Sequence, residues 1–143
     1  MKQKAPLIFS IFATVAVMGV IFWFSSQPGV VSHEESRAFA RWLASLLKIE
    51  EPAAFVEHTN YFLRKLAHFS LYFALGLCMT GAAVRQKRFM PVLLVIVIGT
   101  LFAASDELHQ CFSQGRTPGL TDVLLDVCGV AAGTLPLLYK RKR

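Results

Sequence analysis

The segment SDELHQCFSQGR, residues 105–116, gathers polar and ionisable side chains directly after a long apolar run. It contains two adjacent carboxylates, a histidine, a glutamine and an arginine: Asp106, Glu107, His109, Gln110 and Arg116. Carboxylates and imidazoles transfer protons, and a guanidinium can bind a phosphate or carboxylate through two parallel hydrogen bonds. At helical spacing, Asp106, His109 and Gln110 share one arc, whereas Glu107 is turned aside. The segment indicates acid–base or anion-binding chemistry.

A second segment, NYFLRKLAHFSLYF at residues 60–73, carries side chains of the same kinds. At about 100° per residue, Arg64, His68 and Tyr72 occupy one arc of a helix, with Lys65 at its edge. This helix therefore presents two cations and an imidazole on the same side.

A third segment, DVLLDVCGVAAG at residues 122–133, adds two carboxylates. Asp122, Asp126, Gly129 and Gly133 are spaced i, i+4, i+7 and i+11, which places them on one helix face. The GVAAG stretch is a small-xxx-small motif of the kind that brings helix backbones close together. We therefore expect both aspartates to point into a helix bundle.

The elements that carry these residues are suited to a lipid bilayer. The chain has 143 residues, of which 55% are hydrophobic and 17% charged, and its mean hydropathy is +0.50. Four apolar segments have roughly the 20 residues that cross a bilayer as a helix: 5–24, 66–84, 91–110 and 120–139. A soluble helical core would need polar faces on the first and third, and neither has one. We predict an all-α, polytopic membrane protein with four transmembrane helices in a single domain, residues 1–143.

The basic residues predict the orientation. Nine of the fifteen Lys and Arg residues would fall on one side of a four-helix chain, in three short segments free of Asp and Glu: Lys2, Lys4, Arg85, Lys87, Arg88, Lys140, Arg141, Lys142 and Arg143. The positive-inside rule makes this side, and both termini, cytoplasmic. The net charge of +6 then reflects topology and contact with membrane lipids, and we expect no nucleic-acid partner.

The predicted outer loop, residues 25–65, is long enough to hold a helix of its own. SHEE at residues 32–35 is a capping box, and apolar residues follow it at helical spacing: Ala38, Phe39, Trp42, Leu43, Leu46 and Leu47. This amphipathic helix is expected to lie on the outer leaflet or over the mouth of the bundle, and to end at or shortly before Pro52.

The candidate site is expected at the outer end of the bundle. At about 1.5 Å per residue, His68, Asp106 and Asp126 each lie about one turn inside the outer interface. Ionisable residues at that depth are costly and are functional candidates by default. Three cations are expected to neutralise the carboxylates of Asp106, Glu107, Asp122 and Asp126: Arg64, Lys65 and Arg116. Of these, Arg116 is expected to reach over Asp106 and Asp122. An ion-pair network that only holds helices in register is the structural alternative.

Four segments together resemble the VanZ-like family of small bacterial membrane proteins: FSSQPG at residues 24–29, RKLAHFSLYFALG at 64–76, DELHQCFSQGR at 106–116 and DVLLDVCGVAAG at 122–133. The resemblance implies four helices in the bacterial cytoplasmic membrane and a link to low-level resistance to the glycopeptide teicoplanin. Two positions depart from the family pattern. Leu71 stands where a glutamate is frequent, which removes one carboxylate from the site, and Gln114 stands where a proline is usual.

Two functions use this cluster directly. In a membrane enzyme acting on a lipid-linked or cell-wall substrate, His68 would be the general acid or base, with Asp106 or Asp122 orienting it and Glu107 beside them. A non-catalytic binder of an anionic headgroup or cell-wall precursor would use the same ligand-binding set without bond breaking: Arg64, Lys65, His109, Gln110, Arg116 and Asp126.

Other functions have weaker support in the sequence. A transporter is less consistent because the inner halves of the helices carry almost no polar residues. A metal site of His68, Asp106, His109 and Asp122 would rest on a D-x-x-H pair of low specificity, so we expect no metal. The sequence contains no nucleotide fingerprint, phosphate loop or nucleophile elbow, and we expect no cofactor.

Overall fold

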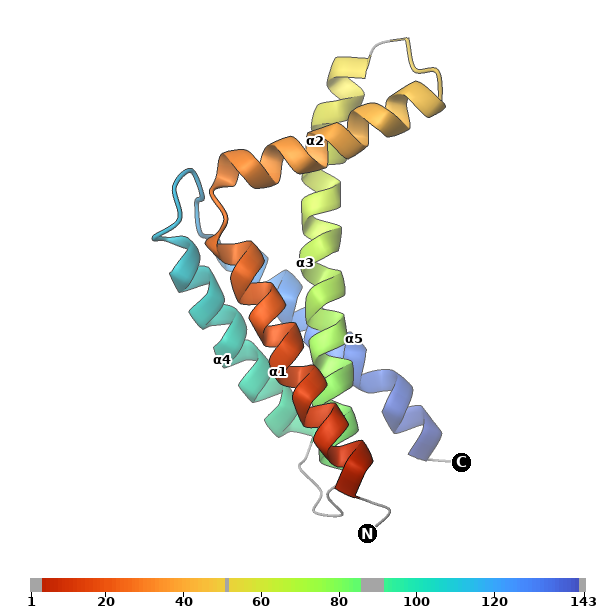
Figure 1. Ribbon diagram of the computed structural model, residues 1–143, viewed down its shortest axis with the longest axis vertical. Helices are drawn as coiled ribbons and strands as arrows, with labels where there is room; N and C mark the ends of the chain where they lie inside the picture. The colour runs from red at the N-terminus through yellow and green to blue at the C-terminus, as the bar shows by residue number, and fades with distance from the viewer. Residues whose placement is uncertain (1–3, 51, 86–91, 142–143) are drawn as a thin grey trace.

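The chain folds as a bundle of helices with one helix lying across its end (Figure 1). The structure is a computed structural model that describes residues 4–50, 52–85 and 92–141. Its elements are α1 (Lys4–Ser26), α2 (Gly29–Leu46), α3 (Pro52–Arg85), α4 (Val92–Gln110) and α5 (Leu120–Arg141). No strand occurs within these ranges, and the predicted all-α class is confirmed.

Three helices of the described ranges are long and apolar enough to cross a membrane: Leu7–Ser26, Pro52–Ala83 and Val92–Gln110. They correspond to the first three predicted spans. The fourth, predicted at 120–139, is occupied by α5, a helix of 22 residues that packs lengthwise against α3. The four-span count remains a prediction.

The segment 25–65, predicted as an outer loop with a helix of its own, is largely helical, and the helix that follows it starts earlier than the sequence indicated. It contains all of α2 and the first part of α3, which begins at Pro52 instead of near residue 66. Proline suits the first position of a helix because its φ is already helical and its missing N–H would have no partner there. Hydropathy detected only the apolar part of this long helix.

The predicted capping box at residues 32–35 is wrong. The residue that caps α2 is Pro28, with φ −54° and ψ 142°, and Ser32 lies inside the helix, where its carbonyl accepts a hydrogen bond from the Ser36 hydroxyl. Proline disfavours helical backbone in the residue before it, so α1 ends at Ser26 and a new helix starts directly after Pro28. The chain thereby turns from the bundle into the crossing helix α2.

The bundle is held together by close contact of small residues between α3 and α5. A Cβ atom added at Gly129 would lie 2.7 Å from the Phe69 carbonyl oxygen and 3.1 Å from Tyr72 Cβ. Gly76 of α3 meets the backbone carbonyl of Val130 in the same way. The face that the sequence assigned to the bundle interior, with Gly129 and Asp126 on it, therefore contacts α3.

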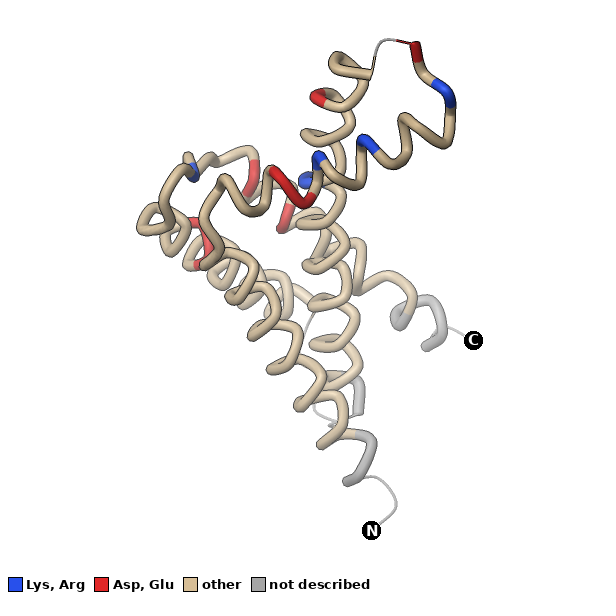
Figure 2. Tube along the Cα trace, turned by 45° about the horizontal axis from the view of Figure 1, so that its top comes forward, with Lys and Arg blue, Asp and Glu red and all other residues tan. Residues whose placement is uncertain are grey.

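The described Asp and Glu residues gather at one end of the molecule, where α2 crosses the bundle (Figure 2). We call this the carboxylate end. The first residue of α1 and the last of α5 lie toward the opposite end (Figure 1). Of the predicted inner basic set, five residues lie outside the described residues: Lys2, Lys87, Arg88, Lys142 and Arg143. Which end is cytoplasmic remains a prediction.

Candidate functional site

Asp106 is the centre of a buried hydrogen-bond network that joins α1, α3 and α4. Its Oδ2 atom accepts hydrogen bonds from the Ser25 hydroxyl at 2.7 Å, the Tyr72 hydroxyl at 3.2 Å and Gln110 Nε2 at 3.4 Å. The residue is only 1% exposed, and buried polar atoms need such partners. Asp106 and Gln110 thus take the inward position that the sequence predicts, and they tie three helices together.

The face of α5 supplies carboxylate partners for two ionisable residues of α3. His68 Nδ1 lies 3.6 Å from Asp126 Oδ1, and Lys65 forms an ion pair with Asp122. The sequence predicted Asp106 or Asp122 as the carboxylate that orients His68, whereas the carboxylate paired with His68 among the described residues is that of Asp126. The reason is the close approach of α3 and α5, which brings residues one turn apart on α5 opposite residues about one turn apart on α3.

Glu107 is not turned aside. It is 6% exposed, and its Oε1 atom accepts a hydrogen bond of 2.6 Å from the backbone N–H of Gly119, directly before α5. A carboxylate at the start of a helix is stabilised by the free N–H groups and the helix dipole there. This geometry makes Glu107 a cap for α5, and its predicted place beside the catalytic residues stays a prediction.

Arg116 also differs from the sequence-based expectation. Its Nε donates to the Gln27 carbonyl at 3.0 Å, its Nη2 to the Phe24 carbonyl at 2.8 Å and its Nη1 to Gln110 Oε1 at 3.3 Å. Within the described ranges it forms no ion pair with a carboxylate. A cation at the end of α1 satisfies carbonyls that the helix leaves free. Burial, followed by the positive charge of Arg64, lowers the pKa of Arg116.

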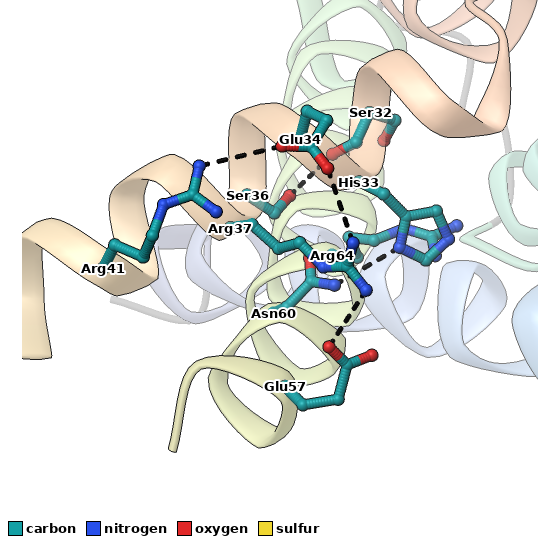
Figure 3. A network of polar contacts seen from close by, with 9 residues as sticks. All are labelled: Ser32, His33, Glu34, Ser36, Arg37, Arg41, Glu57, Asn60 and Arg64. Atoms are coloured by element: carbon teal, nitrogen blue, oxygen red, sulfur yellow. Dashed lines mark hydrogen bonds and ion pairs between the residues drawn. The ribbon is translucent and has the colours of Figure 1, made fainter. Parts of the chain in front are cut away.

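Arg64 contacts a histidine that sequence reasoning did not select (Figure 3). Arg64 Nη1 donates to Nε2 of His33, on α2, at 2.8 Å, and Asn60 Nδ2 lies 3.2 Å from Nδ1 of the same ring. Nearby, Arg37 pairs with Glu34 and Glu57 at the exposed edge of the α2–α3 contact. His33 therefore holds the guanidinium of Arg64 in place from above the bundle.

The tautomer of His33 follows from its neighbours. A neutral imidazole has one N–H and one acceptor nitrogen, and Arg64 can only donate, so Nε2 is the acceptor and Nδ1 carries the hydrogen. Asn60 Oδ1 is buried without a hydrogen-bond partner in the described part of the chain. Rotating the Asn60 side-chain amide by 180° places its Oδ1 next to the Nδ1–H of His33, so that both atoms have a hydrogen-bond partner. Burial, and next the charges of Arg64 and Arg37, lower the pKa of His33 below its usual 6.5.

His109 does not join the other predicted site residues. Its ring stacks on Phe22 of α1, with 4.1 Å between the ring centroids, and its Nε2 lies 3.0 Å from the Ser26 hydroxyl. Both contacts are on the α1–α4 surface. His109 packs two helices together and lines neither of the cavities described next.

Two cavities meet at the carboxylate end. The cationic cavity, of about 210 Å³, is lined by His33, Tyr61, Arg64, Lys65, His68, Gln110, Gly115, Arg116, Thr117, Asp122 and Leu125. The α1–α3 cavity, of about 150 Å³, is lined by Ile21, Phe24, Ser25, Ser32, Glu35, Ser36, Arg64, Ala67, His68, Leu71, Tyr72 and Arg116. Arg64, His68 and Arg116 line both. The convergence of two guanidiniums and an imidazole marks this boundary as the chemical centre of the site.

The donors suit an anion better than a metal ion. Among the residues that the structure describes, no group of three or more His, Cys, Asp or Glu side chains could hold a metal. The two arginines, by contrast, offer N–H groups with the geometry that phosphate and carboxylate oxygens accept.

A sequence profile of the VanZ/LLP1 family matches residues 9–141, nearly the whole chain. The chain belongs to the VanZ/LLP1 family. No curated protein and no solved structure matches it. Membership of this family, together with the apolar helices, supports a membrane protein.

The four segments that resemble the VanZ-like family meet at the carboxylate end. They contribute Ser25, the Arg64–Tyr72 face, the Asp106–Arg116 segment and Asp126 to the networks above. The structure shows the surroundings of the two residues that depart from the family pattern, Gln114 and Leu71. Gln114 uses its carbonyl to accept the Gly29 N–H at 2.8 Å, a contact that proline could also make. Leu71 lines the α1–α3 cavity and makes that wall apolar.

Sequence reasoning missed His33, Asn60 and the bonding role of Ser25. In the sequence, His33 stood out only as part of the predicted capping box. It nevertheless shares one helix face with Arg37, Ala40 and Ala44, which follow it at i+4, i+7 and i+11. Ala40 and Ala44 are buried against α3. That periodicity is the signal that could have placed His33 above Arg64.

Proposed function

We propose that this VanZ/LLP1 protein binds the anionic group, a phosphate or carboxylate, of a lipid-linked or cell-wall-related ligand at the outer face of the bacterial cytoplasmic membrane. One observation carries the proposal. Arg64 and Arg116 are both half-buried and line the same cavity, and among the described residues neither forms an ion pair with a carboxylate. An anion between them would relieve their mutual repulsion.

The guanidinium of Arg64 has N–H groups left for a ligand, which also favours an anion. Among the described residues, Arg64 donates one hydrogen bond to protein, the contact with His33, and a guanidinium has five donors. Lys65 is neutralised by Asp122, so it contributes less to the field in the cavity. The charge presented to a ligand comes mainly from the two arginines, whose planar groups favour oxyanions.

A direct test measures binding of anionic and zwitterionic lipids to the purified protein by native mass spectrometry. We expect Arg64→Gln to weaken retention of anionic lipids about ten-fold or more, since a charge-assisted contact to a partly buried anion is lost. The matched control is Arg41→Gln, because Arg41 is exposed on α2 and lines neither cavity, and its ion pair among the described residues is with Glu34. Equal retention by wild type and Arg64→Gln would refute the proposal.

His68 supports a second candidate, catalysis on the bound ligand. Its imidazole lies between buried Asp126 and the boundary of the two cavities, where a general acid or base would reach a ligand held by the arginines. His68→Asn should then leave lipid binding intact but abolish product formation, seen as altered lipid and cell-wall-precursor profiles in a complemented deletion strain. If the strain complemented with His68→Asn shows the same profiles as the strain with wild-type protein, catalysis by His68 is excluded and only binding remains.

Resistance to glycopeptides is the cellular role that the family resemblance favours. We propose that deletion of the gene changes sensitivity to teicoplanin and that Arg64→Gln fails to restore it, whereas Arg41→Gln does. Restoration by both variants would separate the phenotype from the anion site.

A further inference from the structure

The α1–α3 cavity has a composition that the proposed anion site alone does not require. Its wall between α1 and α3 is formed by Ile21, Phe24, Ala67, Leu71 and Tyr72. Its opposite side carries polar groups of α2 and the adjoining α1 terminus: Ser25, Ser32, Glu35 and Ser36. The cavity is therefore amphipathic, with the polar side next to α2 and the apolar side along two membrane-crossing helices.

The α1–α3 cavity shares part of its lining with the cationic cavity. Arg64, His68 and Arg116 belong to both walls, so a group bound between the two guanidiniums lies at the mouth of each. A ligand held there by an anionic headgroup can extend an apolar portion along Leu71 and Ile21 without leaving the site.

We propose that the ligand is a lipid phosphate whose hydrocarbon chain begins in the α1–α3 cavity while its phosphate lies between Arg64 and Arg116. This inference rests on the proposed function and names the class of ligand for that site. The apolar wall supplies the chain contact, and the paired guanidiniums supply the phosphate contact.

The position of the cavity gives the ligand a route from the membrane. Phe24 is 48% exposed and Ala67 is also exposed, so the cavity opens between α1 and α3. Both helices are membrane-spanning candidates, and α2 crosses at their end (Figure 1). A lipid can move sideways from the bilayer into this opening while its phosphate stays at the level of the interface.

The size of the cavity limits how much of the chain is enclosed. A cavity of about 150 Å³ has room for a molecule of about the size of benzene, so this one encloses at most about six carbon atoms. The rest of the chain remains among the surrounding lipids. Recognition therefore concerns the phosphate and the first carbons of the chain.

The test uses three probes on the full chain in a non-ionic detergent: hexadecyl phosphate, hexadecylphosphocholine and inorganic phosphate. Native mass spectrometry measures the two lipids, and titration calorimetry measures inorganic phosphate. We expect wild type to bind hexadecyl phosphate at least about ten-fold more tightly than either other probe. Inorganic phosphate lacks the chain, and the choline ester of hexadecylphosphocholine blocks one phosphate oxygen and cancels the net negative charge that the two guanidiniums attract.

Two variants isolate the chain contact. Ala67→Leu fills the opening, and Leu71→Asn makes its wall polar. Each should weaken hexadecyl phosphate binding about ten-fold and leave inorganic phosphate binding unchanged. Ala54→Leu, on an exposed part of α3 away from both cavities, is the control. The second variant keeps the test decisive if the first does not fold.

The outcomes separate this inference from the proposed function. If both cavity variants bind hexadecyl phosphate like the Ala54→Leu control, or inorganic phosphate binds as tightly as hexadecyl phosphate, the chain assignment is overturned. The anion site would still stand if Arg64→Gln abolished that binding. If Arg64→Gln binds all three probes as wild type does, the anion site itself is refuted, and the chain assignment with it.

Discussion

Arg116 shows how one residue can serve the fold and the site together. Its guanidinium satisfies the carbonyls of Phe24 and Gln27 at the end of α1 and also contacts Gln110, while the same group lines both cavities. A lysine would keep the charge but not the fork that reaches three acceptors.

We therefore predict that Arg116→Lys lowers the free energy of unfolding by about 1.5–3 kcal/mol, the value of a hydrogen bond to a charged group. Thermal unfolding in detergent measures the effect, with Arg41→Lys as the control. An unchanged melting temperature would mean that these carbonyls are equally well satisfied without the guanidinium.

His33 carries a prediction about pH. Because the lowered pKa of His33 favours the neutral ring in the folded protein, the folded state binds fewer protons than the unfolded one near pH 6. Its contribution to stability is present above pH 6.5, the usual value, and is lost as pH falls through the lowered pKa. Protonation of Nε2 would also break the bond from Arg64.

The wild-type melting temperature should consequently fall between about pH 7 and pH 5, and it should fall less in His33→Gln. Parallel melts across this range compare the two proteins, and His58→Gln gives a control on the neighbouring helix. Identical slopes in wild type and His33→Gln would refute the role of His33.

The sequence predicted which polar residues of the candidate site face the bundle interior, but few of their pairings. Asp106, Gln110, His68 and Asp126 point inward because helical spacing alone fixes which arc they share. The partners of Arg116 are carbonyls at the turn between α1 and α2, and a carbonyl has no signature in the sequence. The contact of His33 with Arg64 depends on the crossing of α2 over α3, which periodicity within one helix does not specify.

At the scale of the elements, α5 depends on small residues for its contact with α3. Gly129→Leu should destabilise the bundle, since a Cβ there already meets the Phe69 carbonyl oxygen at 2.7 Å. Overpacking a tight contact costs about 1–3 kcal/mol or more. Gly19→Leu is a matched control, because nothing lies within 4 Å of a Cβ at Gly19.

Fluorescence-detected size exclusion after heating compares the two variants. We expect Gly129→Leu to lose its monodisperse peak at a lower temperature than both wild type and Gly19→Leu. Equal heat resistance would mean that the α3–α5 contact opens without cost, and the burial of Asp126 would then need another explanation.

The elements also show where hydropathy is informative. The apolar segments at 5–24 and 91–110 became α1 and α4 with ends shifted by at most a few residues, because a bilayer-length apolar run has few alternatives to a helix. The start of α3 was missed since its first part, with Glu57, Asn60 and Arg64, is polar. Its helical form comes from Pro52 and from packing against Ala40 and Ala44 of α2.

At the scale of the whole molecule, the carboxylate end combines three features. The buried carboxylates, the two cavities and the crossing helix α2 all lie there, whereas the start of α1 and the end of α5 lie toward the other end (Figures 1 and 2). Such polarity suits a protein whose site faces one leaflet, because a charged group is tolerated near an interface far better than at the bilayer centre.

The number of spans and the orientation can be decided by one labelling experiment. In a variant with Cys78, Cys111 and Cys128 replaced by serine, single cysteines are introduced as Glu50→Cys, at the carboxylate end, or Lys142→Cys, after α5. Intact cells are treated with a membrane-impermeant thiol reagent, and lysed cells give the total labelling for each variant.

We predict that only Glu50→Cys reacts in intact cells. The positive-inside rule places the basic inner segments, and with them both termini, in the cytoplasm, and the return of α5 toward the end of the molecule where α1 begins supports a fourth crossing. If α5 did not cross, the chain would end on the outer side and both cysteines would react. Reaction of Lys142→Cys alone would show that the orientation is the reverse of the predicted one. The arginine site would then lie at the cytoplasmic leaflet, which would exclude a ligand presented on the cell surface.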